Sequence, residues 1–534
     1  MKSRVVILGA GLAGSEAAWQ CARRGMEVEL YEMRPLRTTP AHQTGDFAEL
    51  VCSNSLKSDS ENTAPWLLKE EMRRAGSLLM EVARECAVPA GHALAVDRRA
   101  FAQRVTEAIS REKLIAVRRE EVTRVGEDQV TIIATGPLTS DGLSREIARL
   151  CGGPAALEQV SEVSSLKGLS SEAQPTRHWC GGLTNSAPAG LGSAAGEMSG
   201  FPRAGGAPLE LDGPTPELLS LPSPAEPTAA RFHLSSTEPP GVRHHLYFYD
   251  SISPIVEAES IDMSRVYLAA RYDKGTPDYI NCPFTKEEYD RFYDALIAAQ
   301  AVEERDWEKL NYFEGCLPIE EIARRGRDTL RFGPMKPVGL RDPRTGKPPY
   351  AVVQLRQENL RADSYNLVGF QNHLKYGEQA RVLRLIPGLE NARFLRYGQI
   401  HRNTYINAPA LLSATLQMKA HPRVLFAGQI CGVEGYVESI ATGLMAGVHA
   451  AAIVEGIEPV AAPRATAFGS LVHYITQADG RKFQPANITF DLLPAWPTKI
   501  RDRAERHRLQ CQRALREFDG WLNLLATHYL VPGT

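Results

Sequence analysis

The stretch RVVILGAGLAG at residues 4–14 decides the fold that we predict for this chain of 534 residues. It joins a β-branched run to a Gly-x-Gly-x-x-Gly pattern, and residues 15–25 then have a helical composition that ends at a glycine. A second strand is expected at residues 26–31, and Glu32 closes it, 23 residues after the first glycine. This order of strand, glycine turn, helix, strand and acidic residue predicts a Rossmann-like α/β unit that binds a dinucleotide.

The glycine turn is expected to hold a pyrophosphate, because glycine lets the backbone approach the ligand and a helix N-terminus stabilises its negative charge. Glu32 would accept hydrogen bonds from a ribose hydroxyl. A tight turn without any ligand is the alternative, and the acidic residue in its expected place argues against it. The cofactor-binding residues predicted here are Gly9, Ala10, Gly11, Leu12, Ala13, Gly14 and Glu32.

A second glycine motif favours FAD over NAD as the dinucleotide. The block LFAGQICGVEGY at 425–436 follows a strand and precedes a helix of small residues expected at 439–455. A third strand, at 130–134, runs into Thr135 and Gly136. Each motif alone is compatible with an ordinary strand–helix turn, but two such units far apart in one chain suit an extended FAD held at both ends. The additional cofactor residues predicted are Gly136, Gly428, Glu434, Gly435 and Tyr436.

Sheet elements near both ends of the chain predict a discontinuous FAD-binding domain, at about 1–148 and 340–460. We expect an inserted α+β domain at 245–339, on the side of the substrate, and a partly helical C-terminal segment at 461–534. Residues 151–243 differ in composition, since 24 of the first 90 are Pro or Gly, against 54 of the other 444 residues of the chain. Such a segment cannot bury enough apolar area to fold, so we interpret it as a flexible, low-complexity insertion.

Composition excludes several classes of protein. The formal net charge is −2, so any contact with nucleic acid must use a local patch, such as residues 321–347, whose net charge is +5. Nine cysteines are scattered without a CxxC pair, which indicates reduced thiols, a cytoplasmic location and no metal site. No stretch approaches 18 consecutive apolar residues, so we expect no membrane span.

Two cysteines stand in polar surroundings that would suit a reactive thiol. Cys52 lies in VCSNS and Cys282 in DYINCP. Most cysteines are small buried hydrophobic residues, whereas thiolates become reactive in polar loops near positive charge. The spacing leaves both readings open for each residue. The block QIHRNTY at 399–405 is an aromatic-flanked polar cluster that suits a heteroaromatic ligand, or is simply a satisfied polar loop.

The chain resembles the FAD- and folate-dependent tRNA uridine-5-methyltransferases over roughly residues 1–148 and 245–500. Long blocks carry the resemblance in order along the chain, and the insertion is the departure from the family's pattern. These blocks include GAGLAGSEAAW (9–19), LYEMRP (30–35), ELVCSNSLKS (49–58), DYINCPFTKEEYDRFYDAL (278–296), FEGCLPIEEIARRGRDTLRFGPMKPVGL (313–340), YGQIHRNTYINAP (397–409) and LFAGQICGVEGYVESIATGLMAG (425–447).

The resemblance implies methylation of C5 of the uridine at position 54 in the T-loop of tRNA. Methylenetetrahydrofolate would supply the carbon, and FAD reduced by NAD(P)H would supply the electrons. It further implies that Cys282 attacks the uracil, that Cys52 lies beside the isoalloxazine, and that Lys336, His401 and Arg402 contact folate or RNA. Two alternatives stay open: a related flavoprotein that modifies the wobble uridine of tRNA, and a non-catalytic flavoprotein that binds tRNA.

Overall fold

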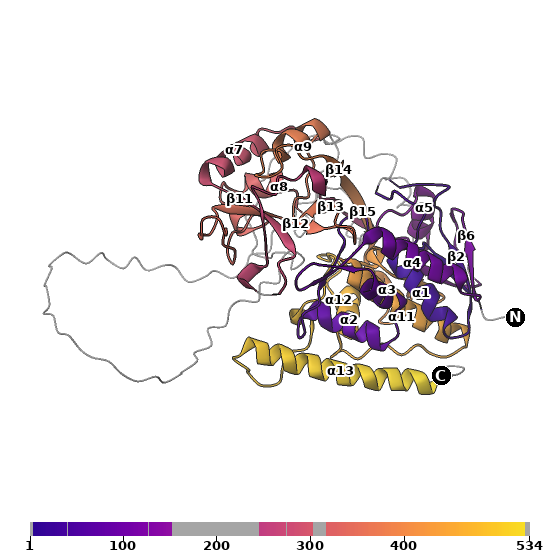
Figure 1. Cartoon of the computed structure of the whole chain (residues 1–534). Coiled ribbons are helices and arrows are strands. Elements are labelled where there is room, and N and C mark those ends of the chain that lie inside the picture. Colours follow the sequence, from indigo (N-terminus) through magenta and orange to yellow (C-terminus); the bar gives the residue numbers. More distant parts are fainter. Residues whose placement is uncertain are drawn as a thin grey trace, which may run out of the picture. The chain divides into compact units, whose positions relative to one another are not determined.

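Figure 1 shows the computed structural model of the chain, and most of the predicted insertion at 151–243 lies outside the residues that it describes. Of residues 245–251 and 400–402 only the backbone is described. All described residues belong to one compact unit. The described residues are 4–39, 41–126, 128–151, 245–273, 275–302 and 317–528.

The predicted strand at residues 4–8 is the centre of a five-stranded sheet in the order β16-β7-β1-β2-β6. Every pair in this sheet is parallel, as the βαβ pattern predicts. β16 comes from residues 424–426 and pairs with β7, so segments from both ends of the chain share one sheet. The predicted Rossmann-like α/β class is confirmed. The strands are β1 (Arg4–Leu8), β2 (Glu27–Tyr31), β6 (Ile115–Arg118), β7 (Val130–Ile133) and β16 (Val424–Phe426).

Two helices from opposite ends of the chain, α1 (Leu12–Ala22) and α11 (Tyr436–Val454), pack backbone to backbone. A Cβ atom on Gly443 would lie 2.2 Å from the carbonyl oxygen of Ala13, so a larger residue there would separate the helices. By length and composition α11 could cross a membrane, although its apolar residues are interrupted by Glu438, Ser439, Thr442 and His449. Its most apolar window is 89% buried inside the protein, as expected of a core helix.

Two helices follow the loop after β2, α2 (Ala64–Arg74) and α3 (Leu78–Glu85). Gly76 adopts a positive φ of 71° between them, and the Ser77 side chain caps α3 by accepting a hydrogen bond from the backbone of Met80. The other elements of this part are α4 (Arg98–Arg111), α5 (Asp141–Leu150) and a small antiparallel sheet of β3 (Ser55–Ser58), β5 (Ala93–Val96) and β4 (Ala87–Val88).

A second, antiparallel sheet has the order β10-β11-β12-β13-β9-β14 and its own hydrophobic cluster, which spans Val256 to Ala392. We expected the inserted domain to end at residue 339. The sheet continues past that point, because three of its strands lie between residues 351 and 396. Its strands and helices are β9 (Ile255–Glu257), β10 (Tyr267–Ala269), β11 (Tyr279–Phe284), α7 (Lys286–Ile297), α8 (Ile319–Arg324), β12 (Ala351–Gln357), β13 (Ser364–Leu367), α9 (Tyr376–Leu383) and β14 (Phe394–Arg396).

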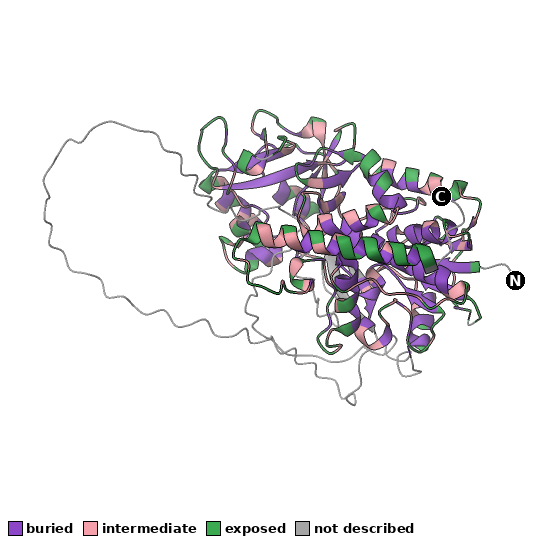
Figure 2. Ribbon diagram, turned by 90° about the horizontal axis from the view of Figure 1, so that it is seen from below, coloured by how far each residue is buried: buried purple, intermediate pink, exposed green. Residues whose placement is uncertain are grey.

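The remaining elements connect and flank the two sheets. α13 (Arg503–His528) carries buried and exposed residues along its length, as Figure 2 shows, and its buried Phe518 stacks on Phe468 of α12 (Ala467–Gln477). β8 (His245–Ser251) pairs with β15 (Ile400–Ile406), and α10 (Ala408–Leu411) follows. The short 3₁₀ helices are η1 (Ala258–Ser260), η2 (Arg271–Asp273), η4 (Thr329–Phe332), η5 (Gln429–Cys431) and η6 (Phe490–Leu492).

Candidate functional site: a dinucleotide groove beside a half-buried cysteine

Two glycines of the first motif, Gly11 and Gly14, have different structural roles. A Cβ atom on Gly14 would lie 1.8 Å from the carbonyl oxygen of Gly9, so this glycine lets α1 pack closely against the turn. A Cβ atom on Gly11 would meet nothing within 4 Å. Gly11 precedes Leu12, the first residue of α1, and leaves open space at the helix N-terminus. That open space is where a phosphate group would lie in a dinucleotide fold.

A groove lies beside this turn. Its walls come from the glycine turn, the end of β2, the loop after β7 and the N-terminal part of α11. Of the predicted cofactor residues, it is lined by Gly9, Gly11, Leu12, Ala13, Glu32, Gly136, Gly428 and Tyr436. Ala10, Gly14, Glu434 and Gly435 are adjacent to the lining without forming part of it.

Glu32 is held in place by Arg34, which the sequence analysis did not single out. Glu32 is 5% exposed, and its carboxylate accepts hydrogen bonds from the backbone of Ala10 (3.0 Å) and from Nε of Arg34 (2.9 Å). Burial alone would raise the pKa of Glu32, but the hydrogen bonds and charge of Arg34 outweigh burial and hold the pKa below its ordinary value. The carboxylate is therefore ionised and can accept hydrogen bonds from a ribose.

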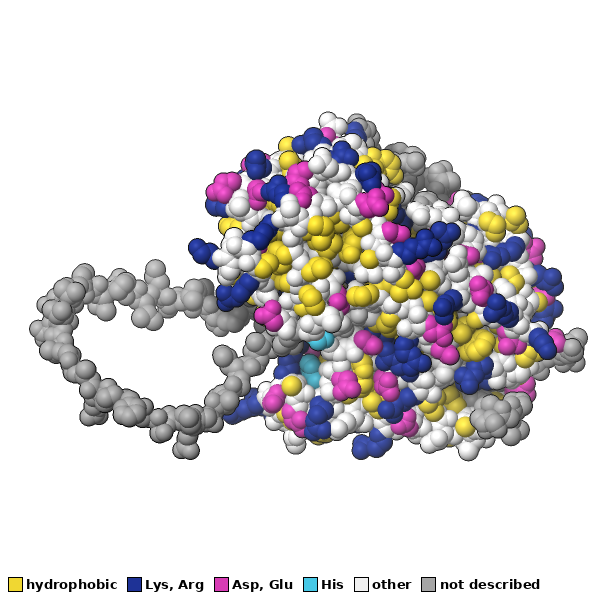
Figure 3. Space-filling view, viewed as in Figure 1, with side chains coloured by type: hydrophobic (Ala, Val, Ile, Leu, Met, Phe, Trp, Pro, Cys, Tyr) yellow, Lys and Arg dark blue, Asp and Glu magenta, His cyan; other side chains and the backbone are white. Residues whose placement is uncertain are grey.

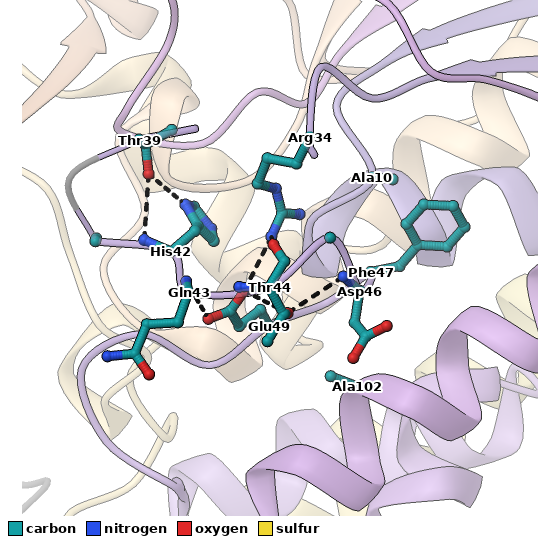
Figure 4. A network of polar contacts seen from close by, with 12 residues as sticks. Ala10, Arg34, Thr39, His42, Gln43, Thr44, Asp46, Phe47, Glu49 and Ala102 are labelled. Carbon is teal, nitrogen blue, oxygen red and sulfur yellow. Dashed lines mark hydrogen bonds and ion pairs between the residues drawn. The ribbon is translucent and has the colours of Figure 1, made fainter. Parts of the chain in front are cut away.

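Arg34 also joins Glu32 to the loop that follows β2. Its Nη1 lies 3.1 Å from a carboxylate oxygen of Glu49, which also accepts hydrogen bonds from Thr44, as Figure 4 shows. His42 lies in the same loop and lines the groove. Burial and the charge of Arg34 lower the pKa of His42 to about 4, so this ring is neutral near pH 7. Arg34 could have been singled out from the sequence by its position in the block LYEMRP, two residues after Glu32.

The second glycine motif forms the opposite wall of the groove. Gly428 (φ 82°) and Gly435 (φ 112°) both adopt conformations that favour glycine. A Cβ atom on Gly428 would lie 3.0 Å from the Cβ of Ala13, so the two glycine motifs face each other closely. Glu434 does not line the groove, and its carboxylate accepts a hydrogen bond from Gln429.

Cys52 does not line the groove, but its neighbour Val51 does, and so does Tyr436. The phenol oxygen of Tyr436 accepts hydrogen bonds from the backbone N–H groups of Cys52 (2.7 Å) and Ser53 (3.1 Å). Among the described cysteines Cys52 alone is half-buried, and the other six are buried. Its charged neighbours include Arg98 and Arg396, which interact with it electrostatically.

Cys282 lies elsewhere, and its expected role as the attacking thiol stays a prediction. It is 0% exposed on β11, in the hydrophobic cluster of the second sheet, together with Ile280 and Phe284. Burial raises the pKa of Cys282 far above its ordinary value, which disfavours the thiolate. A buried neutral thiol among apolar side chains contributes to packing.

The other predicted substrate residues are not brought into the groove. Lys336 is half-buried in the loop after η4, outside the lining, and His401 and Arg402 lie on β15, where their side chains are outside what the structure describes. Four arginines of residues 321–347 form ion pairs with nearby carboxylates, and Figure 3 shows basic and acidic side chains interspersed over one face of the protein. The paired arginines are Arg324, Arg327, Arg331 and Arg344.

No group of three or more His, Cys, Asp or Glu side chains that could hold a metal ion occurs in the part of the chain that the structure describes. The parallel sheet, the glycine turn with open space at the helix N-terminus, and the ionised Glu32 together define a dinucleotide-binding protein of the Rossmann type. Comparison with known proteins refines this class.

The sequence model of the family described as "Glucose inhibited division protein A" matches residues 4–169 and 226–458. It leaves 170–225 unmatched, inside the predicted insertion. A protein of Koribacter versatilis named "Methylenetetrahydrofolate--tRNA-(uracil-5-)-methyltransferase TrmFO" is 62% identical over 98% of both chains. A protein of the same name from Solibacter usitatus is 53% identical, over 96% of this chain and 98% of its own length.

The crystal structure of GidA from Aquifex aeolicus has the same fold, with a TM-score of 0.60 at 15% identity, over 99% of this chain and 75% of that one. The chain belongs to the glucose inhibited division protein A family, and within it to the TrmFO group.

Proposed function

We propose that this protein methylates C5 of a uridine in tRNA, with methylenetetrahydrofolate as the carbon donor. The names of relatives that are 62% and 53% identical over nearly the whole chain support this proposal. The observation in the structure that carries it is Cys52, a half-buried thiol whose neighbour Val51 and backbone contact Tyr436 both line the groove. The likeness to GidA concerns the fold alone, so it does not favour the alternative of a wobble-uridine enzyme.

We propose FAD as the occupant of the groove and NAD(P)H as its reductant. Gly11 would admit the pyrophosphate, Glu32 would accept hydrogen bonds from the ribose, and Gly428 and Tyr436 would line the far part of the cofactor. FAD, when bound and reduced, supplies the electrons that convert a transferred methylene group into a methyl group. We further propose the uridine at position 54 of the T-loop as the target.

We assign the attack on the uracil to Cys52. Carbon 5 of uracil is a weak nucleophile, and addition of a thiolate at C6 makes it an enolate that can attack an electrophilic methylene. Cys52 suits this task because it is half-buried, in a polar loop near Arg98 and Arg396. Cys282 would first have to leave the hydrophobic cluster.

The activity is tested by incubating the protein with a tRNA transcript, methylenetetrahydrofolate labelled in the methylene carbon, and NADPH. We expect label in 5-methyluridine at position 54 and none in a transcript that has cytidine there. Label at the wobble position would instead identify the related uridine-modifying activity. Bound FAD and bound tRNA without any transfer would identify a non-catalytic protein.

The role of Cys52 is tested with RNA that carries 5-fluorouridine at the target position. Fluorine at C5 blocks loss of the proton, so the attacking cysteine should stay covalently bound to the RNA. We expect peptide mapping to find the adduct on Cys52 and to find none in Cys52→Ala. Cys282→Ala is the matched control and should keep the adduct. An adduct on any other cysteine would overturn the assignment.

A further inference from the structure

The residues around the start of α13 carry an excess of positive charge that the sequence analysis did not single out. Residues 499–516 contain seven Lys and Arg residues against two acidic ones, a net charge of +5 in a chain whose net charge is −2. Five of the seven are exposed, and one of these five, Arg508, pairs with Glu505. The other four exposed cations form what we call the α13 basic surface: Lys499, Arg501, Arg503 and Arg516.

The two acidic residues of this stretch do not neutralise the α13 basic surface. The Asp502 carboxylate accepts hydrogen bonds from the backbone of Ala504 at 2.8 Å and of Glu505 at 3.4 Å, so it caps the helix. The Glu505 carboxylate accepts hydrogen bonds from Arg508. Within the part of the chain that the structure describes, no cation of the surface forms an ion pair with a carboxylate.

Exposed arginines elsewhere in the protein are held differently. Arg104 of α4 pairs with Glu85, and Arg381 of α9 pairs with Glu378. Residues 321–347 have the same net charge as residues 499–516, but four of their arginines form ion pairs. An ion pair weakens the attraction that a cation exerts on other anions. The α13 basic surface therefore keeps more of its attraction for an anionic partner.

The position of these cations is unfavourable for the helix itself. A helix N-terminus carries a partial positive charge, so it repels cations and stabilises anions. Arg503 is the first residue of α13, and Lys499 and Arg501 lie just before it. Charges that oppose a local preference are expected at functional sites, where another requirement outweighs stability. An anion bound at this place would remove the conflict.

Direct contacts connect the start of α13 to the dinucleotide groove. The ring of His507, in the second turn of the helix, stacks on Phe490 with 3.9 Å between the ring centroids. Ile488, two residues before Phe490, donates from its backbone to the Glu438 carboxylate of α11 at 3.0 Å. Tyr436, two residues before Glu438, lines the groove. The start of α13 therefore belongs to the same part of the protein as the end of the groove at Tyr436.

We propose that the α13 basic surface binds the phosphate backbone of tRNA and orients this substrate toward the groove. The proposal rests on the proposed function in one respect, the choice of tRNA as the substrate. Guanidinium and ammonium groups bind phosphate through charge and hydrogen bonds, and such contacts position a nucleic acid without reading its sequence. A substrate as large as tRNA extends beyond the site of its reacting base, so contacts at a distance from the chemistry add affinity.

Binding of a fluorescein-labelled tRNA transcript to the full-length flavoprotein, followed by anisotropy, tests the proposal without folate. The test variant is Arg501→Gln/Arg503→Gln/Arg516→Gln. Each lost phosphate contact should lower the slope of log affinity against log salt by about 0.9. Between about 50 and 200 mM salt, the loss of three contacts should make the affinity of this variant about 40-fold less sensitive to salt than that of the wild-type protein.

The matched control removes the same charge from arginines that are in ion pairs. It is Arg104→Gln/Arg111→Gln/Arg381→Gln, and we expect it to keep the wild-type slope. Melting temperature and flavin content, measured on every variant, report whether the fold is kept. If the test variant is insoluble, its single substitutions decide, each with a slope lower by about 0.9. In the unsubstituted protein, bound tRNA should protect Lys499 from acetylation.

Three results would overturn the proposal. The first is a wild-type slope in the test variant, and the second is an equal fall of the slope in the control. The third is a loss of affinity for heparin without any loss for tRNA, which would assign the surface to another polyanion. A wild-type protein that binds no tRNA would overturn the proposed function as well. Salt-dependent binding through this surface without methylation would contradict the proposed function alone.

Discussion

Alanine at Gly11 should abolish binding of FAD without unfolding the protein, whereas alanine at Gly14 should damage the fold itself. The two positions belong to one turn and receive the same added methyl group. Any difference between the two variants therefore depends on where that methyl group lies. At Gly11 the new Cβ enters open space, and at Gly14 it lies 1.8 Å from a backbone oxygen. The space open at Gly11 is the space that we assign to the pyrophosphate.

The expected change in the stability of the apoprotein is small for Gly11→Ala. Gly11 has φ −73° and ψ −166°, which alanine adopts without strain, and the loss of chain freedom in the unfolded state favours alanine by about 0.4–1 kcal/mol. Gly11 is also the N-cap of α1, where alanine is worse than glycine by about 0.5–1 kcal/mol. These terms nearly cancel. For Gly14→Ala we expect a loss of at least about 1–3 kcal/mol, the usual cost of overpacking.

The assay is denaturant unfolding of the apoprotein, with and without added FAD. At a concentration one hundred times its dissociation constant, FAD should stabilise the wild-type protein by about 2.7 kcal/mol, and it should not stabilise Gly11→Ala at all. Absorbance of the flavin released from the purified protein gives an independent measure of binding. Stoichiometric flavin in Gly11→Ala would refute the placement of the phosphate turn, and an unimpaired Gly14→Ala would refute the packing argument.

Two further predictions concern regions away from the groove. Glu71 is fully buried and caps α12 through the backbone of Ala467 and Phe468, and burial raises its pKa from 4.5 to about 8. The folded state therefore binds the proton of Glu71 more tightly than the unfolded state does. In urea unfolding, the free energy of unfolding of the wild-type protein, relative to that of Glu71→Gln, should therefore fall as the pH rises from about 4.5 to 8. A difference between the two proteins that stays constant with pH would contradict this. Deletion of residues 170–225, which the family match omits, should leave flavin content and methylation largely unchanged, and loss of either would show that the segment is needed.

The parts of the fold that could be predicted are those in which a short sequence pattern reflects a backbone conformation that only certain residues can adopt. The first glycine motif predicts β1, α1 and β2, because the turn needs glycine at fixed positions. Gly428 and Gly435 have positive φ angles, so the second motif reports a similar requirement. The end of the second sheet was not predictable in this way. Eight of the seventeen residues at 333–349 are Gly or Pro, which resembles a linker, yet the chain returns to the same sheet at β12.

The surroundings of Cys52 could not be derived from the sequence for a different reason. Arg98, Arg356 and Arg396 are 46, 304 and 344 residues away from it, and each reaches the loop through tertiary packing of another element. No spacing rule connects residues at such separations. A positive environment for the thiol is a property of the folded chain alone, whereas the polar sequence around Cys52 predicted only that the loop is not part of the core.

At Cys282 a local pattern predicts burial, whereas the resemblance implies a catalytic role. Along β11 the apolar side chains of Ile280 and Phe284 alternate with Tyr279 and Asn281, and a strand that alternates in this way turns Cys282 toward the core. Tyr279 lies opposite Arg356, on the face that reaches the Cys52 loop. To bring the Cys282 thiol to that face, β11 would have to slip by one residue against β12. The slip would place Asn281 in the hydrophobic cluster and break its hydrogen bond with Gln354, so the register of this sheet holds Cys282 in the core.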